Sequence, residues 1–184
     1  MSEKRNGQFI VKSSALKYKN KWIEVVEDQV IRPDGKDGIF GVVKMLGGVS
    51  VLPMDEDGYV YMTEEFHYAI EMEDIETASG GIDNDEKSID AAKRELKEEL
   101  GIEAEEWIEL GVVNPFTTVI KSPQKIFLAR KLTFGKDEQE ATENIKLVKV
   151  KLEEAVRMVM GSVITHGPSC VLILKVNEYL KSLK

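Results

Sequence analysis

GGIDNDEKSIDAAKRELKEELGI, residues 80–102, joins a glycine pair, an acidic turn and an amphipathic segment. Apolar residues recur at helical spacing through Ile89, Leu96 and Leu100. Asn84 or Asp85 is available as the N-cap, and Gly101 suits the residue that ends a helix. The pattern therefore predicts a helix over residues 86–100, preceded by a short loop at the glycine pair.

Three carboxylates share one face of this predicted helix, because Glu95, Glu98 and Glu99 stand at positions i, i+3 and i+4. Like charges at these spacings repel, and a bound Mg²⁺ or Mn²⁺ would reverse that local cost. Arg94 is close enough to orient one carboxylate through a bidentate ion pair. A run such as Lys97-Glu98-Glu99 is more often plain solvated surface, so the run alone does not establish a metal site.

The wider spacing favours the metal site over the solvated face. The segment fits the pattern G-x5-E-x7-R-E-U-x-E-E-x-G-U, where U is aliphatic, and a chance match is about one in a hundred million per window. This pattern is the signature of the Nudix hydrolases, which the chain resembles from residue 31 to residue 179. The flanks, among them residues 48–53, 76–80 and 110–129, resemble the ADP-ribose pyrophosphatase branch of that family. The matching positions are Gly80, Glu86, Arg94, Glu95, Leu96, Glu98, Glu99, Gly101 and Ile102.

The resemblance implies the Nudix fold, an α/β (α+β) class α/β/α sandwich around a mixed β-sheet, with an N-terminal β-strand extension. It implies hydrolysis of a nucleoside diphosphate linked to a second moiety X, with Mg²⁺, or alternatively Mn²⁺, as cofactor. The implied metal ligands are Glu95 and Glu99, with Glu98 as a third ligand or water-orienting group and the Ser79 backbone carbonyl as a further one. Arg94 is implied to hold Glu95, and Glu86 to stabilise the loop and helix.

The substrate contacts are less well defined, because the chain departs from the branch at two places. His67 stands where the branch typically has an arginine that contacts substrate, and residues 114–123 lack the usual Pro-Gly and acidic residue. We expect His67, Glu76 and Phe40 to contact substrate, Phe40 by stacking on the base. Packing is nevertheless the commoner role of large aromatic residues, and this holds for all four candidate rings: Phe40, Phe66, Tyr68 and Phe116.

A catalytic base outside the signature is expected on the acidic segment 136–143. Glu143 is the first candidate and Glu140 the second, because both precede the strand predicted at residue 145. A solvated charged loop is the alternative interpretation of this segment.

The remaining pattern predicts strands before and after the central helix and helices at the end. Strands are expected at residues 9–11, 21–31, 39–45, 49–54, 59–65, 107–113, 125–129 and 145–150, and further helices at residues 152–160 and 169–183. Residues 1–45 are longer than a minimal Nudix fold needs, so we expect a β-strand extension that pairs two subunits of a homodimer. Residues 46–184 then form the Nudix domain.

Composition sets limits on the partners. The 184 residues carry a formal net charge of −8, which argues against nucleic-acid binding and leaves a small-molecule nucleotide, bound through a cation, as the expected partner. The one cysteine, Cys170, has no partner for an internal disulfide, and no stretch is apolar enough to cross a membrane, so we expect a cytoplasmic protein. Two alternatives remain: hydrolysis of dinucleotides or damaged nucleoside triphosphates, and a Nudix domain that binds nucleotides without catalysis.

Overall fold

The computed structural model describes residues 4–135 and 145–183. The chain divides into two compact units. The first comprises Met1–Gly47 with Asn114–Ser122, and the second comprises Gly48–Val113 with Pro123–Lys184. Each unit is described by itself.

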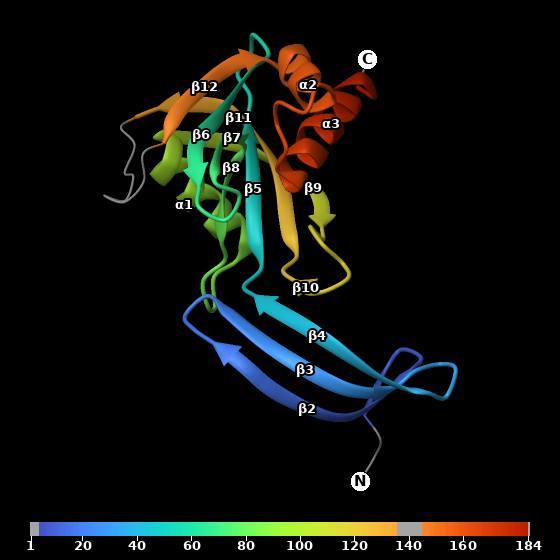
Figure 1. The fold of residues 1–184 in the computed structure, drawn as a ribbon. Helices are drawn as coiled ribbons and strands as arrows, with labels where there is room; N and C mark the ends of the chain where they lie inside the picture. The colour runs from blue at the N-terminus through green and yellow to red at the C-terminus, as the bar shows by residue number, and fades with distance from the viewer. Residues whose placement is uncertain (1–3, 136–144, 184) are drawn as a thin grey trace. The chain divides into compact units, whose positions relative to one another are not determined.

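The first unit is a twisted sheet with strand order β1-β2-β3-β4-β10 (Figure 1). Successive strands β1 to β4 pair antiparallel, and β10 pairs in parallel with β4. Sequence patterning placed the second strand in residues 9–11 only, which is too short, because its outer part is polar and exposed and lacks a core signal. The strands are β1 (Lys4–Asn6), β2 (Phe9–Lys19), β3 (Ile23–Ile31), β4 (Asp37–Met45) and β10 (Ile120–Lys121).

The second unit holds two smaller sheets, ordered β8-β5-β11-β9 and β12-β6-β7. The first of these is mixed, because β11 runs parallel to β5 and antiparallel to β9. Strands β7 and β8 were missing from the sequence-based prediction, since both are short and lack clear alternation. The strands are β5 (Gly48–Pro53), β6 (Tyr59–His67), β7 (Met72–Glu76), β8 (Ala78–Gly81), β9 (Ile102–Val113), β11 (Gln124–Phe134) and β12 (Lys146–Lys151).

Helices cover both faces of the second unit's sheets (Figure 1), namely α1 (Ser88–Leu100), α2 (Leu152–Met160) and α3 (Gly167–Lys181). Alternate residues of β5 enter two separate cores: Val49 and Val51 pack on the α1 side, whereas Leu52 packs on the α2 and α3 side. The α/β/α sandwich with a mixed sheet is therefore confirmed. Helix α2 has the predicted bounds, and α3 begins two residues earlier than predicted.

The two ends of α1 differ in how well the sequence predicted them. Gly101 ends the helix in the left-handed conformation at φ 62°, as expected for a glycine C-cap. The predicted N-caps are wrong: Lys87 occupies the N-cap position with no side-chain cap hydrogen bond, and Asp85 lies in the loop at φ 65°. The predicted loop at Gly80 and Gly81 is also wrong, since both residues belong to β8 and pair with β5.

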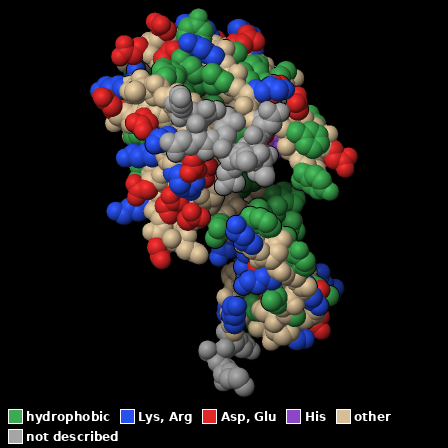
Figure 2. Space-filling model, turned by 90° about the vertical axis from the view of Figure 1, so that its left-hand side faces the viewer, with side chains coloured by type: hydrophobic (Ala, Val, Ile, Leu, Met, Phe, Trp, Pro, Cys, Tyr) green, Lys and Arg blue, Asp and Glu red, His purple; other side chains and the backbone are tan. Residues whose placement is uncertain are grey.

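The surface of the second unit carries charges of both signs. Figure 2 shows Asp and Glu side chains interspersed with Lys and Arg on the visible face of the second unit. Among the helices of residues 4–135 and 145–183, none has the length and apolar character needed to traverse a lipid bilayer.

Candidate active site

Strand β8 lies directly against the acidic face of α1. The backbone N–H of Ser79 donates to both carboxylate oxygens of Glu99, each at 3.3 Å. At the next residue, a Cβ added to Gly80 would lie 2.0 Å from Glu95 Oε1. A side chain at position 80 would therefore displace the Glu95 carboxylate from the volume it now occupies.

Arg94 contacts three glutamates of the carboxylate cluster. Its Nη1 donates to Glu95 Oε1 at 2.7 Å and to Glu98 Oε2 at 3.0 Å. Its Nε and Nη2 both donate to Glu86, at 3.1 Å each, and Nη2 also donates to the Gly81 carbonyl at 2.9 Å. One guanidinium thus joins the loop, the end of β8 and two glutamates of α1, a task that needs its planar, multi-donor geometry.

The charges at this cluster shift two pKa values in opposite directions. The hydrogen bond from Arg94 lowers the pKa of Glu86 below its ordinary 4.5, helped by the backbone N–H of Asp83. The hydrogen bond to Glu86 in turn raises the pKa of Arg94, so the guanidinium stays charged throughout the physiological range. The two residues therefore remain an ion pair at neutral pH.

The lowered pKa of Glu86 predicts a pH-dependent contribution to stability. A group with a folded-state pKa below its unfolded value stabilises the protein at pH values above the unfolded pKa, and this contribution is lost as pH falls through the folded pKa. We expect the difference in unfolding free energy between wild type and Glu86→Gln to be largest near pH 7 and to shrink below about pH 4.5. Denaturant unfolding at several pH values in EDTA measures it, and a pH-independent difference would contradict it.

Arg94→Lys keeps the positive charge but loses the planar guanidinium and its several N–H donors. A single ammonium cannot replace contacts to Glu86, Glu95 and Glu98 at once, so we expect the free energy of unfolding to fall by roughly 1–3 kcal/mol. Chemical denaturation of the metal-free protein measures this loss. The matched control is Arg157→Lys, which changes an exposed pair with Glu154 and is expected to cost less than about 0.5 kcal/mol.

The carboxylate cluster has the chemistry of a site for a hard divalent cation. The oxygens of Glu95, Glu98 and Glu99 and the backbone of Ser79 are ligand types that Mg²⁺ prefers. In the conformation seen here, Glu95 and Glu98 turn toward Arg94 and Glu99 turns toward the Ser79 N–H. Accordingly, no three His, Cys, Asp or Glu side chains within residues 4–135 and 145–183 converge on one metal position. The donor set fits the ion, and binding it requires these carboxylates to turn.

Glu76 and His67, two of the expected substrate contacts, lie side by side. His67 Nε2 is 3.0 Å from Glu76 Oε1, an ion-pair distance. The contact is not aligned as a hydrogen bond, so within the described chain this buried nitrogen lacks a hydrogen-bond partner. Glu76 is 9% exposed and His67 lies at the end of β6. The pair is a compact polar contact between the end of β6 and the end of β7.

His166 and Ser169 lie near Glu76, although the sequence did not predict either as a site residue. His166 Nδ1 lies 2.9 Å from Glu76 Oε2 and 2.8 Å from the hydroxyl of Ser169, which contacts Thr77. No spacing rule relates residues 90 positions apart, so only the fold could reveal this cluster.

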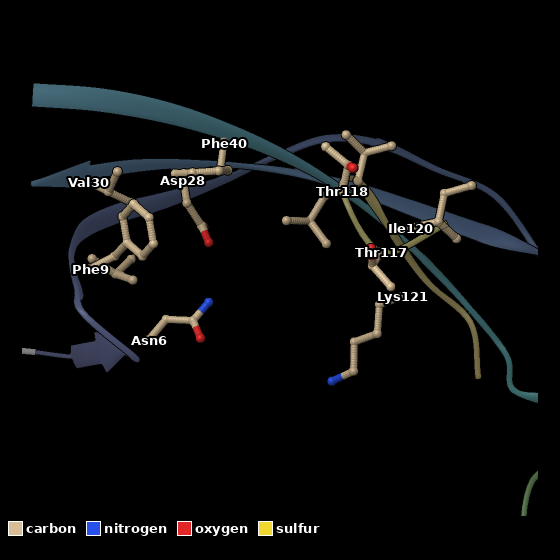
Figure 3. Close-up of a pocket in the computed structure, with 12 residues that line it drawn as sticks. Asn6, Phe9, Asp28, Val30, Phe40, Thr117, Thr118, Ile120 and Lys121 are labelled. Atoms are coloured by element: carbon tan, nitrogen blue, oxygen red, sulfur yellow. The ribbon is translucent and has the colours of Figure 1, made fainter. Parts of the chain in front are cut away.

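Phe40 lies in the first unit, where it lines a cavity of about 270 Å³ with Phe9, Asp28 and Thr117 among others (Figure 3). The Phe9 and Phe40 rings meet edge to face, with centroids 5.0 Å apart. None of the four candidate rings packs in the core of the single chain, and packing at an interface between chains stays a prediction. All four are exposed: Phe40 by 39%, Phe66 by 59%, Tyr68 by 91% and Phe116 by 51%.

The predicted general bases, Glu140 and Glu143, lie outside the described residues.

The chain is similar to known protein families and to a solved structure. The NUDIX domain model matches residues 45–159, and the model of the nucleoside diphosphate sugar hydrolase N-terminal domain matches residues 10–43. A solved structure described as an ADP compounds hydrolase superposes with a TM-score of 0.84 over 98% of both chains, at 19% identity. At that identity the superposition shows the shared fold.

Two curated relatives cover nearly the whole chain. The ADP-ribose pyrophosphatase of Bacillus subtilis (strain 168) is 25% identical over 171 residues, covering 91% of this chain and 92% of the relative. The methanol dehydrogenase activator of Bacillus methanolicus is also 25% identical, over 174 residues, covering 89% and 91%. Together with the family match across 45–159, these findings identify the chain as a member of the Nudix family, a pyrophosphate-bond hydrolase related to ADP-ribose pyrophosphatase.

Proposed function

We propose that the protein is an Mg²⁺-dependent pyrophosphohydrolase of nucleoside diphosphates linked to a second moiety. The proposed substrate is ADP-ribose, cleaved to AMP and ribose 5-phosphate, or a related nucleotide sugar. One observation carries the proposal: the backbone of Ser79 and Gly80 lies against the carboxylates of Glu99 and Glu95, with Arg94 joining the cluster.

The roles of the cluster follow from its donor atoms. Glu95 and Glu99 are the proposed principal ligands of Mg²⁺ (or Mn²⁺), with the Ser79 carbonyl and Glu98 as further ligand or water-orienting groups. When bound, the ion offsets phosphate charge and lowers the pKa of a coordinated water. Arg94 holds Glu95 in place beside β8 and keeps Glu98 on the same face of α1. The cation also explains how a chain of net charge −8 attracts an anionic substrate.

Similarity to hydrolases of known substrate class supports the substrate assignment. The N-terminal match is to a family of nucleoside diphosphate sugar hydrolases, and one relative is an ADP-ribose pyrophosphatase. We propose that His67 and Glu76 contact the substrate, and that Phe40 stacks on its base. Glu143, or Glu140 in its place, is the proposed general base.

We further propose that the first unit, built mainly from residues 1–45, pairs two copies of the chain, each with its own Nudix domain in residues 46–184. Large apolar side chains on this unit are exposed, including Leu16 (59%), Trp22 (66%) and Ile39 (63%). Exposed apolar surface of this kind is typical of a protein interface. Light scattering after size exclusion tests the homodimer: wild type should elute as a dimer and Trp22→Glu at a lower mean mass. A monomeric wild type would contradict the proposed homodimer.

We also propose a cytoplasmic location, which the single cysteine, Cys170, fits.

Turnover measurements test the proposed activity. The panel comprises ADP-ribose, GDP-mannose, UDP-glucose, NADH, diadenosine polyphosphates and 8-oxo-dGTP, each assayed with Mg²⁺ and again with excess EDTA. Release of AMP and ribose 5-phosphate from ADP-ribose, abolished by EDTA, is the expected result. Turnover of another member alone would move the substrate assignment, and turnover that survives EDTA would contradict the metal dependence.

A further inference from the structure

The start of α3 is tied to the strand segment that leads into the active site. Thr165 donates its hydroxyl and its backbone N–H to Asp74. His166 lies against Glu76, as described above. The hydroxyl of Ser169 accepts from the backbone N–H of Thr77 at 2.9 Å. Residues 165–169 thus contact Asp74 and Glu76 of β7 and Thr77 just beyond it.

Thr77 is the single residue between strands β7 and β8. Strand β7 pairs with β6 as far as Glu76, and β8 pairs with β5 from Ala78 onward. Thr77 therefore belongs to neither ladder, and its backbone N–H finds its partner in the Ser169 hydroxyl instead. Both side chains are fully buried, so water cannot replace this hydrogen bond.

The hydroxyl of Ser169 has three polar neighbours. Besides the Thr77 N–H, these are Thr77 Oγ1 at 3.1 Å and His166 Nδ1 at 2.8 Å. A serine hydroxyl has one donor and two acceptor sites. It can accept from the Thr77 N–H and from His166 Nδ1 while donating to Thr77 Oγ1. This set of partners fixes the position of the backbone at Thr77.

The same short segment contacts the proposed metal ligands at its other end. Two residues after Thr77, the N–H of Ser79 meets Glu99, and one residue later Gly80 lies against Glu95. We propose that Ser169 is a positioning residue for metal binding: by fixing Thr77 where the chain passes between the two sheets, it places Ser79 and Gly80 against the glutamates of α1. This inference rests on the proposed function of Glu95 and Glu99.

Direct binding of Mn²⁺ tests the role of Ser169 without relying on turnover. Free Mn²⁺ gives an electron paramagnetic resonance signal that is lost on binding, so titration yields a dissociation constant. We expect Ser169→Ala to weaken Mn²⁺ binding about tenfold, the size of effect typical of residues that orient metal ligands. Unchanged affinity in a folded Ser169→Ala protein would overturn the inference. If Ser169→Ala does not fold, Ser169→Cys keeps a side chain of similar size but offers the Thr77 N–H only a weak sulfur acceptor. It should weaken binding in the same direction, and unchanged affinity there would overturn the inference.

The control variant is Cys170→Ala, one residue along the same helix. Its thiol contacts the Ile164 carbonyl and not the 76–80 segment, so Mn²⁺ affinity should stay at the wild-type value. Equal weakening in Cys170→Ala would show a general effect of α3 stability and overturn the inference. Glu99→Gln separates the two proposals. If Glu99→Gln binds Mn²⁺ as tightly as wild type, the proposed metal site itself is wrong. If Glu99→Gln weakens Mn²⁺ binding but Ser169→Ala does not, only the proposed role of Ser169 is wrong.

Discussion

Glu99→Gln is expected to lower turnover of the hydrolysed substrate at least about 100-fold while leaving the protein folded. The amide is neutral and supplies one weaker oxygen ligand where the carboxylate supplied two charged ones, so the proposed metal site loses affinity. The fold should persist, because the amide oxygen can still accept the Ser79 N–H that the carboxylate accepts now. Steady-state turnover with Mg²⁺ and thermal unfolding in EDTA measure the two effects separately.

The matched control for this variant is Asp90→Asn. It removes the same charge from the same helix, at an exposed position in the first turn of α1. Asp90→Asn should keep turnover close to wild type. Near-normal turnover in Glu99→Gln would contradict the assignment of Glu99 as a ligand, and an equal loss in both variants would indicate a nonspecific effect of charge on α1.

Gly80→Ala is expected to cause a loss of turnover of similar size by a steric route. The added Cβ would lie 2.0 Å from Glu95 Oε1 and 2.1 Å from its Cδ. The backbone cannot retreat, because Gly80 pairs with Val49 of β5. The Glu95 carboxylate must therefore swing away and give up its 2.7 Å bond with Arg94. Since the obstacle is the mobile end of a side chain, the protein should fold, with a loss of roughly 1–3 kcal/mol in unfolding free energy.

Gly81→Ala provides a close control for that experiment. A Cβ at Gly81 would meet no heavy atom within 4 Å, and this glycine does not have a positive φ. We expect Gly81→Ala to retain wild-type turnover at saturating Mg²⁺. If Gly80→Ala also retained it, the close approach of β8 to Glu95 would have no catalytic importance.

The sequence predicted helix α1 and its carboxylate face because both depend on short-range spacing. Glu95, Glu98 and Glu99 share a face through helical periodicity alone, and Gly101 ends α1 because it accepts a left-handed conformation. The substrate contacts and the role of the N-terminal extension stay predictions. The N-cap was mispredicted, since several polar residues in the 83–88 loop compete for it and a cap depends on backbone geometry.

The contacts that hold this helix in place arise between distant parts of the chain. Strand β8 is not predicted from the sequence, because its four residues, two of them glycine, owe their pairing to β5 and carry no pattern of their own. The tie between Ser169 and Thr77 joins residues 92 positions apart. Local periodicity thus sufficed to predict the carboxylate face of α1, and the metal chemistry of that face stays a prediction. Which backbone faces those carboxylates, and what holds it there, depended on long-range packing and on the need of a buried N–H for a partner.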